Sequence, residues 1–187
     1  MATFKNPIAY GKRYAAQNID ALNRVGVCAA GTTVYNGTLV TLGVMNTEAA
    51  KGMNYVFPAT PVATSDGTAK DVWMVRAPEV PMDVCGNLYD DPRAFSVEGG
   101  RPFDMIRPMP GDIIHLSDAA FGANTKPDAV TNKFVYSDTD GEWQAAANGT
   151  GKGFVAKLQA IEAIPVGQEF VTGYVLEVVQ NPTGALA

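Results

Sequence analysis

The sequence is poor in the residue types on which many enzymes and nucleic-acid-binding proteins depend. It has one histidine (His115) and two cysteines among 187 residues, and only 18% of its residues are charged. A single histidine excludes any mechanism that needs two in one chain, and a zinc site needs three or four closely spaced ligands. The 14 basic residues against 19 acidic ones give a net charge of -5, which argues against a broad basic face for nucleic acid. We therefore expect no metal, no cofactor and no nucleic-acid partner.

Long apolar runs are also missing. No stretch reaches the roughly 18 residues that a membrane-spanning helix needs, and the start MATFKNPIAYGKRYAAQN has no apolar core typical of a secretory signal. We expect no membrane association and synthesis in a cytoplasm. Cys28 and Cys85 are then expected to be buried, reduced thiols, and a disulfide between them stays open as the alternative.

What the sequence does contain is many short apolar runs separated by turn residues. This pattern predicts a mainly β protein, an antiparallel sandwich or barrel. The Asn36–Gly37 pair between two β-branched runs predicts a type I′ turn joining two strands. The expected strands cover residues 32–35, 38–42, 71–77, 113–117, 133–137, 142–146, 151–161 and 169–180.

The N-terminal region has a different pattern. Residues 1–10 show little periodicity and predict an extended arm. Residues 10–25 carry apolar side chains at spacings of three to five, which favours one short amphipathic helix. The expected organisation is an arm and helix over 1–25, followed by a single β-rich domain over 26–187.

Six of the twelve prolines fall within residues 78–112. Because proline removes a backbone donor and keeps the preceding residue extended, this segment predicts a long ordered excursion without regular helix. Excursions of that length usually cover a site or bind a partner. The expected partner-binding residues come from the arm and from this segment: Phe4, Pro7, Ile8, Tyr10, Pro78, Pro81, Arg93, Arg101 and Arg107.

No catalytic motif is complete. The stretch NGTGKGF resembles a phosphate-binding loop, but Gly153 follows Lys152 where that loop needs Ser or Thr, so a turn between strands is the favoured interpretation. The carboxylates between Asp83 and Asp112 keep open an enzyme with a carboxylate pair, although nearby arginines explain them as salt bridges. We expect no catalytic residue and a non-enzymatic protein.

Three stretches resemble the head decoration (cement) proteins of tailed bacteriophages: the start MATFKNPIAYGKRYAAQN, the run MPGDIIHLSDAAFG and the ending AIPVGQEFVTGYVLEVVQ. The resemblance implies a structural protein of the virion, bound to the major capsid protein on the outer surface of the head. It also implies self-association, often as a trimer. Apolar residues on both faces of 169–180 suit burial at such a subunit interface.

A glycan-binding β-sandwich of a fibre or adhesin is the alternative function. It depends on Trp73 and Trp143, whose rings could stack on sugars, although aromatic side chains also fill cores and interfaces.

Overall fold

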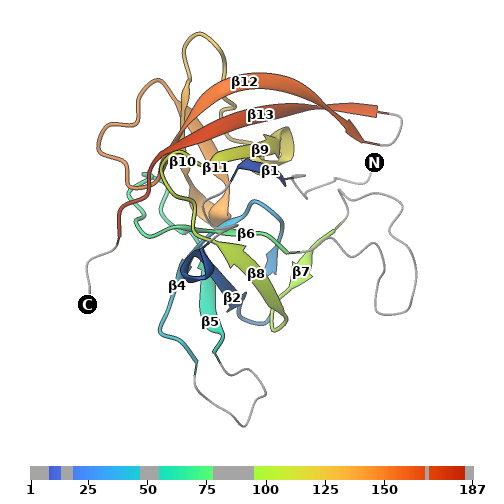
Figure 1. Ribbon diagram of the computed structural model, residues 1–187, viewed down its shortest axis with the longest axis vertical. Helices are drawn as coiled ribbons and strands as arrows, with labels where there is room; N and C mark the ends of the chain where they lie inside the picture. The colour runs from blue at the N-terminus through green and yellow to red at the C-terminus, as the bar shows by residue number, and fades with distance from the viewer. Residues whose placement is uncertain (1–8, 14–18, 47–54, 78–94, 167–168, 184–187) are drawn as a thin grey trace.

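A computed structural model describes residues 9–13, 19–46, 55–77, 95–166 and 169–183, and this part of the chain is mainly β-structure (Figure 1). Its helical elements are three short 3₁₀ turns, η2 (Asp20–Leu22), η5 (Asp118–Phe121) and η6 (Thr139–Gly141). The strands are β1 (Ala9–Arg13), β2 (Asn23–Val27), β3 (Thr33–Val34), β4 (Leu39–Leu42), β5 (Phe57–Pro61), β6 (Trp73–Val75), β7 (Val97–Glu98), β8 (Pro102–Ile106), β9 (Ile113–Ser117), β10 (Phe134–Ser137), β11 (Trp143–Ala146), β12 (Val155–Val166) and β13 (Glu169–Gln180).

The strands form two main units that pack against each other. Five strands close into a barrel in the order β2-β5-β4-β6-β8, in which only the β2–β5 pairing is parallel. Six strands form an antiparallel sheet in the order β1-β9-β13-β12-β10-β11. A two-stranded ladder of β3 and β7 completes the fold. The mainly β prediction is confirmed, and the barrel is one of its two predicted forms.

Strand β6 of the barrel is apolar on both faces, and both of its faces are buried. In β6, Trp73 and Val75 point into the barrel interior, whereas Met74 between them points into the core shared with the sheet. Leu39 and Val40 divide in the same way. Successive side chains of a strand alternate in direction, so continuous apolar runs are what two covered faces require.

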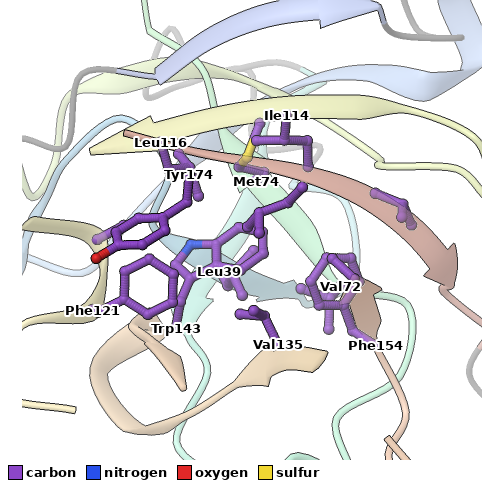
Figure 2. Packing of buried hydrophobic residues seen from close by; sticks show 14 of the residues in the cluster. Leu39, Val72, Met74, Ile114, Leu116, Phe121, Val135, Trp143, Phe154 and Tyr174 are labelled. Carbon is purple, nitrogen blue, oxygen red and sulfur yellow. The ribbon is translucent and has the colours of Figure 1, made fainter. Parts of the chain in front are cut away.

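The core between barrel and sheet is built around aromatic rings (Figure 2). Phe121 meets Tyr174 edge-on at 5.2 Å between ring centroids, and Trp143 meets Phe154 edge-on at 5.4 Å. The indole Nε1 of Trp143 donates a 2.8 Å hydrogen bond to the carbonyl of Gly37. This bond joins the sheet to the turn before β4 and satisfies the one polar group of a fully buried ring.

Two predictions near the N-terminus are wrong. No helix covers residues 10–25: their described parts form β1, the short turn η2 and β2, because long-range pairing with β9, β5 and β8 supplies the backbone bonds. The Asn36–Gly37 turn exists, with Gly37 at φ 84°, but Asn36 does not have a positive φ, so the turn is not type I′. Nor does it make a hairpin, since β3 pairs with β7 and β4 with β5 and β6.

The remaining strand predictions are confirmed. The hairpin of β10 and β11, the strand β9 and the strand β13 all lie where the alternation placed them. The predicted strand over 151–161 is present from Val155 and continues to Val166. The expected domain division between residues 25 and 26 falls inside β2. Residues 95–112 of the Pro-rich segment contain β7 and β8, while 78–94 lie outside the described residues.

Candidate functional site

Only three of the nine predicted partner-binding residues lie in the part of the chain that the structure describes: Tyr10, Arg101 and Arg107. Phe4, Pro7, Ile8, Pro78, Pro81 and Arg93 lie outside the described residues. Tyr10 lies in β1, opposite His115 of β9, so the end of the expected arm is a strand of the six-stranded sheet. The structure therefore does not bring the arm and the Pro-rich segment together into one described surface.

The Arg107 side chain is largely buried and bonds to other segments of the fold. Its Nε lies 2.6 Å from the Asp71 carboxylate, its Nη2 donates to the carbonyl of Asn181 at 3.2 Å, and its Nη1 lies 3.4 Å from the sulfur of Met109. Only 12% of the Arg107 side chain is exposed. These contacts favour a structural role, because its donors already hold three segments of the chain together. Arg101 is different: it is exposed and lies 3.9 Å from Glu98 on the same surface turn.

The single histidine packs within the six-stranded sheet. His115 is buried on the face shared with Val175, and its Nε2 lies 3.9 Å from a carboxylate oxygen of Glu162. A Cβ on Gly173 would fall closer than 3.0 Å to that nitrogen, so glycine there makes room for the imidazole. This burial between neighbouring strands favours a structural role for His115.

Cys28 and the two tryptophans are all buried. Cys28 is a free, buried thiol, and burial raises its pKa to about 11. Because the thiolate is the nucleophilic form, this thiol is poorly reactive at neutral pH. Cys85 lies outside the described residues. Trp73 and Trp143 are 2% and 0% exposed, so neither ring is available to stack on a glycan.

A polar cleft of about 740 Å³ is lined by residues that precede β4 and by residues in or near the short turns η5 and η6. Its lining includes Tyr35, Gly37, Asp118, Lys126 and Glu142. Lys126 Nζ lies 3.3 Å from Asp118, and Asn124 donates to Glu142 at 3.4 Å. These contacts balance part of the charge inside the cleft, which leaves a surface suited to hydrogen bonding with a polar group.

The long β12–β13 hairpin extends beyond the strands on either side of it. β9 pairs with β13 only between Gly173 and Glu177, and β10 pairs with β12 only between Val155 and Lys157. The described pairing of the hairpin nevertheless continues to Val166 opposite Glu169. Figure 1 shows this end of the hairpin reaching past β1 and β9. Among the described residues, no third strand pairs with its far half, although Ile164 there is buried and packs against Val171.

An apolar row continues along this far half. Tyr174 and Leu176 of β13 point into the core, and Phe170 and Thr172 continue the same row outwards. Phe170 is 73% exposed, and Ile161, which is paired with Tyr174, is 47% exposed. Within one chain, this row is buried at Tyr174 and Leu176 and exposed at Phe170 and Thr172. The expected burial of 169–180 at a subunit interface stays a prediction. Phe170 is exposed because β9 pairs with β13 only as far as Gly173. The sequence of the hairpin alone does not show where that pairing ends.

Comparison with known proteins assigns no relative. No family model, no curated protein and no solved structure matches the chain. Within the described ranges, no helix is long and apolar enough to cross a membrane. The same residues include no group of three or more His, Cys, Asp or Glu side chains placed to hold a metal ion.

Proposed function

We propose that this chain is a non-enzymatic structural protein of a bacteriophage virion, which binds the outer surface of the capsid as a decoration protein. The major capsid protein and further copies of the chain are its partners. The observation that carries the proposal is the projecting half of the β12–β13 hairpin, where the core-forming row ends in exposed Phe170 and Ile161. The resemblance of its start, its 109–122 run and its ending to decoration proteins supports the same function.

The physical basis is burial on assembly. Exposed aromatic side chains are enriched at protein interfaces, and a few such residues contribute most of the binding free energy. A hairpin that projects from a rigid sheet can insert against a neighbouring copy without changing the fold of either. The contacts proposed for the capsid are the arm at Phe4, Pro7, Ile8 and Tyr10 and the Pro-rich segment from Pro78 to Pro110, without the largely buried Arg107. Many copies on a repeated lattice multiply modest contacts into strong attachment.

Phe170→Asp is expected to prevent self-association. The substitution removes the largest exposed apolar side chain of the projecting half and places a charge in the proposed interface. Loss of one central aromatic contact weakens binding by about a hundredfold. Light scattering coupled to size-exclusion chromatography should show the wild type as an oligomer and Phe170→Asp as a monomer at the same concentration.

Val130→Asp is the matched control, because Val130 is 83% exposed in a loop that is not part of the projecting half of the hairpin. It makes the same change of charge and should leave the oligomer intact. A monomeric wild type, or an oligomer unaffected by Phe170→Asp, would show that the hairpin is not the subunit interface.

Removal of residues 1–8 is expected to abolish capsid binding while leaving the fold and the oligomer intact, since the deletion spares β1. The measurement is co-sedimentation with shells formed by the major capsid protein encoded in the same genome. The full chain should sediment with the shells and the truncated chain should stay in solution. If the full chain stays in solution as well, the decoration function is wrong; if both sediment, only the arm mechanism is wrong.

A further inference from the structure

Arg24 lies at one mouth of the five-stranded barrel. In β2, Arg24 and Gly26 pair with Met105 and Phe103 of β8, and both partners belong to the barrel interior. Alternate residues of a strand share a face, so Arg24, Gly26 and Cys28 form one inward row. Gly26 and Cys28 are buried, whereas Arg24 is exposed. The row thus places a guanidinium where the apolar interior of the barrel meets solvent.

Two aromatic rings hold this guanidinium in position. Its central carbon lies 4.4 Å from the ring centroid of Phe57 and 4.7 Å from that of Trp73. Contacts between a cation and an aromatic ring are electrostatically favourable, and they use none of the N–H donors of the arginine. The rings therefore position the group while leaving its hydrogen-bonding capacity for something else.

No carboxylate of the described chain pairs with Arg24, although acidic residues outnumber basic ones. Asp104 is close along the ladder, but it is paired with Val25 and so points to the opposite face from Arg24. Trp73 itself is buried in the barrel, so only the guanidinium reaches solvent. The mouth thus presents an exposed donor group that has no carboxylate partner among the described residues.

We infer that this mouth, formed by Arg24 and Phe57 above the buried Trp73, is a docking site for a carboxylate side chain in an acidic segment of a partner protein. A guanidinium binds a carboxylate through two parallel hydrogen bonds, and barrel mouths are common positions for ligand sites. Half-buried Phe57 gives the methylene groups of a glutamate an apolar surface. The inference goes beyond the proposed function, because it defines the chemistry of a second contact surface away from the β12–β13 hairpin.

The test is a titration of the ¹⁵N-labelled full chain with the peptide acetyl-Gly-Glu-Gly-amide, followed through the Arg24 Nε–H and Trp73 indole resonances. Both are expected to shift in a saturable way, and the matching glutamine peptide should leave them in place. Hydrogen bonds to charged groups contribute enough that Arg24→Gln should weaken binding about tenfold or more. Arg24→Lys keeps the charge but lacks the planar guanidinium, so its affinity for the peptide should lie between those of the wild type and Arg24→Gln.

Arg101→Gln is the control, since it removes the same charge from an exposed arginine that has its own neighbour in Glu98. It should bind the peptide as the wild type does. Shifts that do not saturate, or equal weakening by Arg24→Gln and Arg101→Gln, would overturn the site. Saturation of the same resonances by inorganic phosphate, and not by the peptide, would overturn the choice of carboxylate. Arg24→Lys provides the comparison if Arg24→Gln fails to fold.

Discussion

Gly153→Ala is expected to destabilise the protein by about 3 kcal/mol or more, because overpacking against fixed backbone is among the costliest core substitutions. A Cβ at this position would fall closer than 3.0 Å to both the carbonyl carbon and the carbonyl oxygen of Ala69. Those atoms are backbone and cannot rotate away. Residues 153–154 are also hydrogen-bonded to residues 67–69. The Gly153 N–H donates to the Gly67 carbonyl at 2.8 Å, and the Phe154 N–H donates to the Ala69 carbonyl at 3.0 Å.

Thermal and urea unfolding measure this effect, and the midpoint temperature should fall by roughly 10 °C for a chain of this size. Gly151→Ala, two residues earlier in the same turn, is the control. Gly151 has φ 77° but nothing within 4 Å of the added Cβ, so only the left-handed backbone conformation opposes alanine, at about 1–2 kcal/mol. Equal losses for the two variants would show that the close approach to Ala69 does not decide the requirement for glycine.

Asn181→Ala should lower the free energy of unfolding by about 3–5 kcal/mol, because it leaves several buried backbone groups without partners. The Asn181 amide donates to the carbonyls of Val72 at 2.8 Å and Pro108 at 2.9 Å, and its oxygen accepts from the Val72 N–H at 3.0 Å. The side chain thus joins the end of β13 to the segments before β6 and after β8. One residue at the end of the sheet thereby fixes the position of two barrel segments.

Asn148→Ala supplies the comparison in urea unfolding, because Asn148 is exposed and accepts one local bond from the Thr150 N–H at 3.3 Å. Its loss should stay within about 1 kcal/mol. An Asn181→Ala protein as stable as Asn148→Ala would mean that water or small shifts satisfy the Val72 and Pro108 groups after truncation.

Much of the β-structure could be predicted from the sequence because it depends on local patterns. The hairpin around Asp138–Gly141 needs a turn between two alternating runs, and both are visible in the residues themselves. The strand at 169–180 was predictable for the same reason. Local patterns failed at residues 10–25, where apolar spacing suits a helix but pairing with distant strands decides the structure.

The candidate sites were harder to predict, because burial and pairing depend on other parts of the chain. Arg107 and Arg101 both follow the same kind of local pattern in the sequence. In the structure, Arg107 donates hydrogen bonds to Asp71 and Asn181 inside the fold, whereas Arg101 lies on the surface. Arg24 gave no local signal beyond being a charged residue at the end of a stretch predicted to be helical. Its role emerges only when β5 and β6 bring Phe57 and Trp73 beside it.

The sparse charge, the single histidine and the short alternating runs determined by themselves that this is a β protein without a histidine-rich metal centre. Tertiary structure decided which runs pair, which of two apolar faces is covered, and that Phe170 and Arg24 are exposed. The physical reason is that alternation specifies two faces for each strand but not what covers them. That depends on contacts between residues far apart in the chain, such as the close approach of Gly153 to Ala69.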